Sequence, residues 1–235
     1  MGGYEKEGKY SLINLLKDGK ATLEEWIKPI DANYECIALR AGGYNIQPSK
    51  EIVKAMQATG LKIDSSIYPG GKETGTLSNY DYSNIAKEKE FWQAGNELEK
   101  EGENGVFELP IVAFPIPRWK KFASIERIKS LLKNRKSAKD SFEAKTSCGE
   151  GKKSSKLDKI KYFFQDEWQT WDYCLFSASL HNEFLKEIKK QRERKVFTLV
   201  GHPNGYMGGN GFKHLLEKTA KEYNFKTIND ICNEL

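Results

Sequence analysis

Residues 34–71 read YECIALRAGGYNIQPSKEIVKAMQATGLKIDSSIYPGG, and this stretch decides the fold class. Its first part, residues 34–40, is a mostly apolar run that is typical of a buried strand. A helix is predicted to follow, because Ser49 is a suitable N-cap and Gly60 a suitable C-terminal stop. Residues 61–67 then have the pattern of a second strand. A strand, a helix and another strand in this order predict a parallel β-α-β unit.

The rest of the chain continues this alternation. The capping-box pattern TLEE at residues 22–25 predicts the start of an early helix, which Pro29 stops. An amphipathic helix is predicted around residues 212–220. Further strands are predicted at residues 106–112, 171–177 and 195–200. We therefore expect an α/β fold in one domain, residues 1–235, with a mainly parallel sheet that is either open or closed into a barrel.

Composition excludes several classes of protein. The 235 residues include 38 Lys and Arg against 33 Asp and Glu, a formal net charge of only +5, so we expect no nucleic-acid partner. No apolar run approaches the roughly 18–20 residues of a membrane-spanning helix, so no membrane partner is expected. The N-terminus, MGGYEKEGKY, lacks the apolar stretch of a signal peptide, which favours a cytoplasmic location.

Two further features concern metals and mobile segments. The four cysteines are scattered and form no CxxC pair, which disfavours a structural zinc site. Only three histidines are present, so the chain has few residues for metal chemistry of its own. Residues 130–161 are rich in Lys and Ser, and they predict a helix and a mobile surface loop inserted into the domain.

Polar residues follow two of the predicted strands. Arg40 ends the strand at 34–40, and His202 follows the strand at 195–200 between a glycine and a proline. Ligand sites of parallel α/β folds lie at the carboxyl ends of strands. His202 is the best candidate for a general acid or base, since imidazole exchanges protons near neutral pH. The alternative is a histidine that only fills the turn.

Three more residues are candidates for the same site. Asp172 lies in an otherwise apolar stretch, and a buried Asp needs a partner, so it is a candidate to orient His202. The alternative is an Asp exposed at the start of the strand. Ser65 and Ser66 follow Asp64 at the end of the second strand, where they either line the site or form a turn.

Together these motifs resemble the NodB-like polysaccharide deacetylases. The specific block is RAGGY to DSSIYPGG, within residues 38–71, and NYDYSN, FELPIV, WDYCLFS and LVGHPNGY follow in the expected order. The resemblance covers residues 34–232. It implies a distorted (β/α)7 barrel and the metal-assisted removal of acetyl groups from sugars, a hydrolysis of carbon–nitrogen bonds other than peptide bonds.

The resemblance also implies roles for single residues. Arg40 matches the family's arginine, which holds and tunes an aspartate base. His202 matches the histidine that protonates the leaving amine, and Asp172 matches the acidic residue that supports it. Tyr44 and Tyr82 are candidates to contact sugar, because aromatic faces pack well on pyranose rings, and the alternative for each is ordinary core or surface packing. Ser65 and Ser66 are candidates for substrate binding from their position at the end of the strand.

The family's metal motifs precede its arginine motif, and here the 39 residues before Arg40 contain no histidine. A zinc-like divalent metal is implied by the family, but its ligands are not found in this chain. We therefore expect a partial, N-terminally incomplete barrel that is inactive alone. Its expected partners are an acetylated polysaccharide or sugar and the missing N-terminal part of the domain.

Two other functions remain open from the sequence. The first is a catalytically inactive module that binds carbohydrate or regulates a partner. The second is an unrelated α/β protein with an interaction role, which the RAGGY to DSSIYPGG block makes the least favoured.

Overall fold

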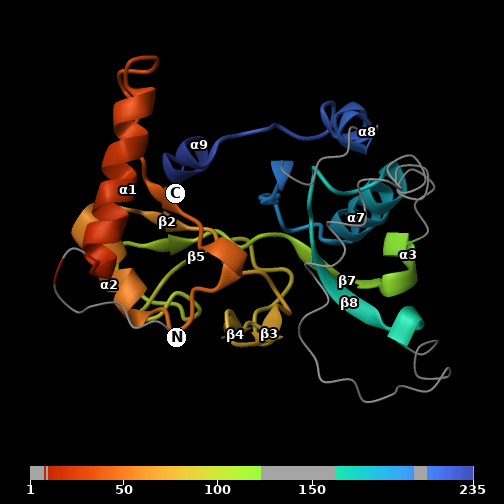
Figure 1. The fold of residues 1–235 in the computed structure, drawn as a ribbon. Coiled ribbons are helices and arrows are strands. Elements are labelled where there is room, and N and C mark those ends of the chain that lie inside the picture. The colour runs from red at the N-terminus through yellow and green to blue at the C-terminus, as the bar shows by residue number, and fades with distance from the viewer. Residues whose placement is uncertain (1–7, 9, 123–161, 204–210, 235) are drawn as a thin grey trace, which may run out of the picture. The chain divides into compact units, whose positions relative to one another are not determined.

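The computed structural model describes residues 8, 10–122, 162–203 and 211–234 (Figure 1). The chain divides into two compact units, one of Met1–Val112, Glu193–Thr198 and Asn224–Leu235, the other of Ala113–Arg192 and Leu199–Tyr223. The chain leaves the first unit after Val112 and returns to it twice, and the single domain predicted from the sequence stays a prediction. The predicted insertion at 130–161 lies outside the described residues.

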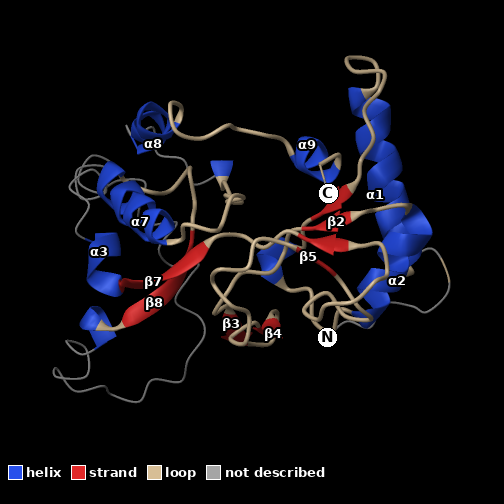
Figure 2. Cartoon of the chain, turned by 180° about the vertical axis from the view of Figure 1, so that it is seen from behind, coloured by secondary structure: helices blue, strands red, loops and turns tan. Residues whose placement is uncertain are grey.

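The first unit is built on a four-stranded sheet in the order β1-β2-β6-β5 (Figure 2). Three of its strands are parallel and the fourth, β5, is antiparallel to β6. The strands are β1 (Ala38–Leu39), β2 (Ile63–Asp64), β5 (Trp92–Gln93) and β6 (Phe107–Glu108). The predicted strands at 34–40, 61–67 and 106–112 are thus confirmed in part, and each pairs in parallel with its neighbour.

The helix between the first two strands confirms the β-α-β unit. Helix α2 (Lys50–Thr59) ends at Gly60, whose φ of 70° lies in the left-handed region that glycine adopts without strain. Its buried residues are Val53, Ala55 and Met56. Ser49 precedes the helix as predicted, but its side chain accepts a hydrogen bond from Leu98 N at 2.9 Å instead of capping the helix.

Helix α1 (Leu12–Ile27) begins earlier than the capping-box pattern predicts. Its N-cap is Ser11, whose hydroxyl accepts from the backbone N–H of Asn14. Thr22, the first residue of the TLEE pattern, lies inside the helix and donates to the carbonyl of Asp18. The prediction failed because a hydroxyl four residues beyond a helical carbonyl can bond to it as readily as it caps a new helix. Helices α1 and α2 pack side by side.

The first unit also contains shorter elements around one apolar core. The core includes Ile46, Met56, Ile67, Tyr82 and Leu98. The shorter elements are the 3-10 helix η1 (Gly42–Tyr44), the hairpin of β3 (Lys72–Thr74) and β4 (Asn79–Asp81), and helix α9 (Ile228–Cys232).

The second unit has its own core, formed by Trp171, Phe114 and Phe184 with Leu215 and His181. An antiparallel pair of strands and two packed helices, α7 and α8, surround it. The elements are β7 (Ala113–Pro117), α3 (Arg118–Phe122), β8 (Asp166–Thr170), α7 (Ala178–Lys190) and α8 (Gly211–Thr219). The helix predicted around 212–220 is confirmed. The chain is therefore mixed α/β, which is the fold class that the sequence predicts.

Two predicted strands are not strands. Residues 171–177 form a turn, because the Asp172 side chain takes the backbone N–H groups of Cys174 and Leu175. Residues 195–200 make only two isolated bridges, Ile111 to Thr198 and Asp172 to Val200. Here the backbone N–H groups of Lys195 and Val196 donate to the Glu90 carboxylate, so they do not form hydrogen bonds with a neighbouring strand.

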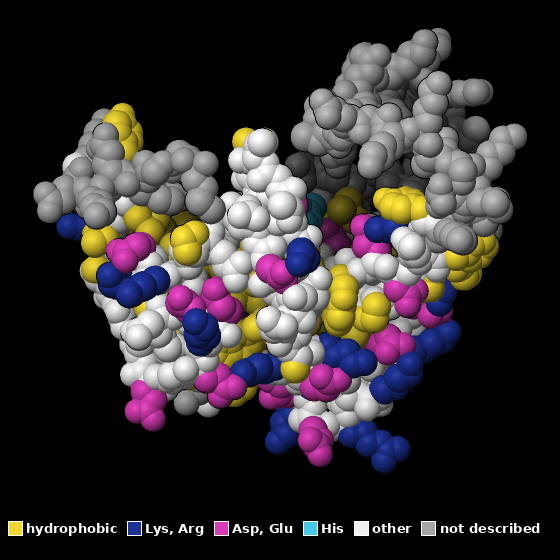
Figure 3. Space-filling model, turned by 90° about the horizontal axis from the view of Figure 1, so that it is seen from below, with side chains coloured by type: hydrophobic (Ala, Val, Ile, Leu, Met, Phe, Trp, Pro, Cys, Tyr) yellow, Lys and Arg dark blue, Asp and Glu magenta, His cyan; other side chains and the backbone are white. Residues whose placement is uncertain are grey.

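The visible surface is mixed in charge. On the face in Figure 3, Lys and Arg side chains alternate with Asp and Glu instead of gathering in one basic patch. Of the helices in the described residues, none has the length and apolar character that crossing a membrane requires.

His181 is the titratable group that most affects the second core. It has no exposed surface, its Nδ1 accepts from Trp171 Nε1–H at 3.0 Å, and its Nε2 has no hydrogen-bond partner among the described residues. Burial, with a smaller contribution from nearby His214, lowers the pKa of His181 to about 4. The folded chain thus holds this imidazole neutral, whereas the unfolded chain protonates it near pH 6.5.

We predict that acid weakens the second unit through His181. The pKa of His181 is lower in the folded chain than in the unfolded chain. The free energy of unfolding is therefore unaffected by His181 above pH 6.5 and decreases as the pH falls toward 4. At pH 5 the decrease is about 2 kcal/mol. The variant His181→Asn keeps an acceptor for Trp171 and does not titrate. Denaturant unfolding at pH 7 and pH 5 should show a smaller acid loss in the variant than in the parent. An equal loss in both would contradict the prediction.

Candidate functional site

The second unit brings Asp172 and His202 together, as the sequence analysis expects. Asp172 Oδ2 lies 2.5 Å from His202 Nδ1, so the two side chains are hydrogen-bonded. The backbone bridge between Asp172 and Val200 sets this contact, since it holds the two segments side by side two residues before His202. A Cβ at Gly201 would overlap the ring of Tyr173, so a larger residue there would require that ring to move.

The carboxylate of Asp172 is fixed from both sides. The residue is buried, and its Oδ1 accepts from the backbone N–H groups of Cys174 at 2.8 Å and Leu175 at 2.9 Å. His202 is more open, with 46% of its side chain exposed. A carboxylate only accepts hydrogen bonds, so it assigns the proton of a neutral imidazole to Nδ1. Nε2 is then the ring nitrogen that carries the lone pair.

Cys174 lies beside this pair but is not an activated nucleophile. Burial and the negative charge of Asp172 raise the pKa of its thiol, while a hydrogen bond from the His202 backbone opposes them. A reactive cysteine requires the opposite, a stabilised thiolate. The surroundings of Cys174 therefore do not favour thiol chemistry at this position.

The first unit holds Arg40 at the end of β1. Its Nε donates to the carbonyl of Ser65 and its Nη2 to the hydroxyl of Ser65, both at 2.8 Å. Ser66 in turn accepts from the backbone N–H of Ala41 at 2.8 Å. The two serines thus hold the guanidinium and the start of the following turn.

Three residues predicted to contact substrate are interior. Ser65 and Ser66 have no exposed surface, and Tyr82 is 1% exposed. In the structure Ser65 and Ser66 support Arg40 and Ala41, and Tyr82 supports the next turn, while contact of these residues with a substrate stays a prediction. The Tyr82 hydroxyl donates to the carbonyl of Tyr44 at 2.6 Å and accepts from the N–H of Ile46.

Tyr44 remains a candidate to contact a ligand. It is half-buried and has a φ of 60°, a left-handed conformation that is strained for a non-glycine residue. Its ring packs edge-on against Tyr68, with centroids 5.1 Å apart. Arg40 and Tyr44 belong to the first unit and the Asp172–His202 pair to the second, so the expected common groove of Arg40 and His202 stays a prediction.

Sequence reasoning missed Glu108. It has no exposed surface and lies beside Asp64, which is equally buried, in the parallel register of β2 and β6. Burial raises the pKa of both carboxyls, and the charge of Asp64 adds to the effect on Glu108. The available signal was an acidic residue in the otherwise apolar stretch VFELPIV.

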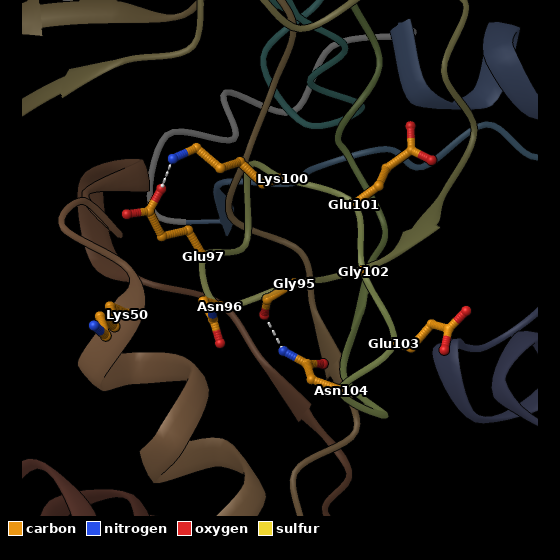
Figure 4. Close-up of a pocket in the computed structure, with 9 residues that line it drawn as sticks. All are labelled: Lys50, Gly95, Asn96, Glu97, Lys100, Glu101, Gly102, Glu103 and Asn104. Atoms are coloured by element: carbon orange, nitrogen blue, oxygen red, sulfur yellow. Dashed lines mark hydrogen bonds and ion pairs between the residues drawn. The ribbon is translucent and has the colours of Figure 1, made fainter.

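A hollow on the surface of the first unit lies apart from these residues (Figure 4). Its lining contains both positive and negative side chains, and Lys100 Nζ forms an ion pair with Glu97 Oε2 at 2.5 Å. None of the site residues predicted from the sequence lines it. The lining residues are Lys50, Gly95, Asn96, Glu97, Lys100, Glu101, Gly102, Glu103 and Asn104.

The described residues do not fit the divalent metal that the resemblance implies. Within the part of the chain that the structure describes, no group of three His, Cys, Asp or Glu side chains is arranged to hold a metal ion. Asp172 and His202 are engaged with each other and supply no third ligand.

No family model, curated protein or solved structure matches this chain.

We predict that Asp172→Asn changes the tautomer of His202. The amide oxygen can still accept from the turn, but the amide NH2 group only donates, so it cannot accept a hydrogen bond from Nδ1–H. Long-range ¹H–¹⁵N NMR of the imidazole should show the hydrogen moving from Nδ1 to Nε2. The control is Asp166→Asn, an exposed residue of β8. An unchanged imidazole spectrum in Asp172→Asn would rule out the assigned contact.

We also predict that metal removal leaves the chain unchanged. The parent should bind zinc no better than His202→Ala does, and a chelator should not shift its melting temperature. Metal analysis of the purified protein and thermal melts with and without chelator test this. Stoichiometric zinc that is lost on mutating a defined set of ligands would refute it.

Proposed function

We propose that this chain provides the acid–base part of a polysaccharide-deacetylase-like hydrolase site acting on acetylated sugars. The observation that carries the proposal is the contact between Asp172 and His202, at 2.5 Å. The motif order around Arg40 and His202 supports it. The proposed fold is a partial distorted (β/α)7 barrel, and the parallel pairing of β1, β2 and β6 is consistent with it.

The chemistry follows from what an amide needs. An amine is a poor leaving group unless its nitrogen gains a proton as the carbon–nitrogen bond breaks. The imidazolium of His202 can give that proton from Nε2. Asp172 keeps the ring in the required orientation and stabilises its positive charge. Positioned acid catalysis of this kind contributes typically ~10²–10⁴-fold to a rate.

This chain's own residues are assigned to recognition and proton transfer only. The described residues do not supply a set of ligands for a metal that would activate water. We therefore expect turnover only when the metal-binding part of such a domain is added, and none from the chain alone.

A second function, a catalytically inactive carbohydrate-binding module, is favoured by the same observation on metal ligands. It makes the same prediction for binding. It differs for turnover, because adding the metal-binding part would then produce no acetate.

We expect the chain to bind an N-acetylglucosamine tetramer more tightly than a glucosamine tetramer. Calorimetric titration of both oligomers measures this. His202→Ala should weaken the acetylated ligand by about tenfold, the scale of one lost hydrogen bond. The matched control is His214→Ala, since His214 bonds to Asn182 and lies in helix α8.

Equal affinity for both oligomers, with no effect of His202→Ala, would overturn the proposal. Acetate release after adding the metal-binding part of a related domain separates the two functions. Release that His202→Ala reduces by ~10²-fold or more supports the hydrolase.

A further inference from the structure

The first unit contains a pair of carboxyl groups that the proposed function does not use. Asp64 and Glu108 end the adjacent parallel strands β2 and β6, in register, and neither has any exposed surface. Their side chains are hydrogen-bonded to each other. Two carboxylates only accept hydrogen bonds, so this contact requires one proton between them.

The surroundings assign that proton to Glu108. Asp64 accepts two hydrogen bonds from Ser66, from its backbone N–H and from its hydroxyl, both at 2.8 Å. Glu108 accepts only one, from the N–H of Ile67 at 3.2 Å, and its Oε2 receives none from the described residues. Asp64, which accepts more hydrogen bonds, is therefore the ionised partner, and Glu108 carries the proton.

The pair is linked to the turn that follows Arg40. The Ser66 hydroxyl donates to Asp64 and accepts from the N–H of Ala41, the residue before η1. Ser65, which lies between Asp64 and Ser66 in the sequence, accepts two hydrogen bonds from the guanidinium of Arg40. Any movement of the Asp64 carboxylate is thus passed through Ser66 to Ala41.

We propose that Glu108 is a positioning residue whose proton holds the Asp64 carboxylate on Ser66, and so fixes Ala41 and the turn Gly42–Tyr44, until a rise in pH removes it. The other ionisable groups that face the pair are Arg40, at the end of β1, and Tyr82, which follows β4. Arg40 stays charged throughout, and the pKa of Tyr82 is raised by burial, so neither replaces the proton.

The direction of the pH effect follows from the raised pKa of Glu108. A carboxyl that is protonated in the folded chain but ionised in the unfolded chain stabilises fully at acid pH. That contribution is lost as pH rises through the folded pKa. Two buried charges would then face each other, and the bond from Ala41 to Ser66 would open first.

Hydrogen exchange of the Ala41 amide tests the proposal in the whole chain. After correction for intrinsic base catalysis, its protection should fall up to tenfold per pH unit once Glu108 ionises. Glu108→Gln keeps a donor to Asp64 and cannot ionise, so its Ala41 protection should stay constant with pH. The matched control Glu101→Gln, an exposed residue of the same unit, should behave as the parent.

Constant protection of Ala41 in the parent, or an equal fall in Glu108→Gln, would overturn the proposal. If Glu108→Gln does not fold, the ¹³C shift of the Glu108 carboxyl in the parent decides the matter. A protonated carboxyl at pH 7 supports the proposal, and an ionised one overturns it. Neither measurement depends on His202 or on sugar binding.

Discussion

A carboxylate with no access to water must be compensated by nearby donors, and Asp64 is the residue on which this constraint acts most strongly in the first unit. Its compensation comes from three sources: the N–H and hydroxyl of Ser66 and the carboxyl of Glu108. These groups lie at the carboxyl ends of the strands, because Ser66 follows β2 and Glu108 ends β6. The turn after β1 therefore depends on one buried charge being satisfied, because the Ser66 hydroxyl bonds both to Asp64 and to the N–H of Ala41.

The sequence predicts the β-α-β unit because its signals are local. The helix ends at Gly60, where glycine alone avoids strain at a φ of 70°, and the apolar runs on either side need a buried sheet. It fails where side chains compete with the backbone. Glu90 takes the N–H groups of Lys195 and Val196, so an apolar run that is suited to a strand makes only single bridges. Such long-range competition leaves no periodic signal in the sequence.

The candidate site shows the same division. The pairing of Asp172 with His202 is predictable, because a lone acid in an apolar stretch needs a partner and His202 ends a neighbouring segment. The burial of Ser65, Ser66 and Tyr82 is not predictable from their types, since all three are common on surfaces. Which of them is interior is decided by the packing of β2 between β1 and β6 and by the tyrosine cluster, where Tyr80 and Tyr82 stack 4.7 Å apart.

Asp64 and Asp172 form the same kind of side-chain turn, and the two turns have different surroundings. Asp64 is the last residue of β2, and Asp172 forms an isolated bridge with Val200. Each carboxylate accepts a hydrogen bond from the backbone N–H of the residue two positions later, which is Ser66 for Asp64 and Cys174 for Asp172. Exposed aspartates such as Asp81 form the same turn with Ser83, so the turn itself carries no function. The difference is burial: once the carboxylate is withdrawn from water, it needs a further proton donor. Asp64 finds one in Glu108 and Asp172 finds one in His202, so the interior turns a common turn motif into a proton-holding pair in each unit.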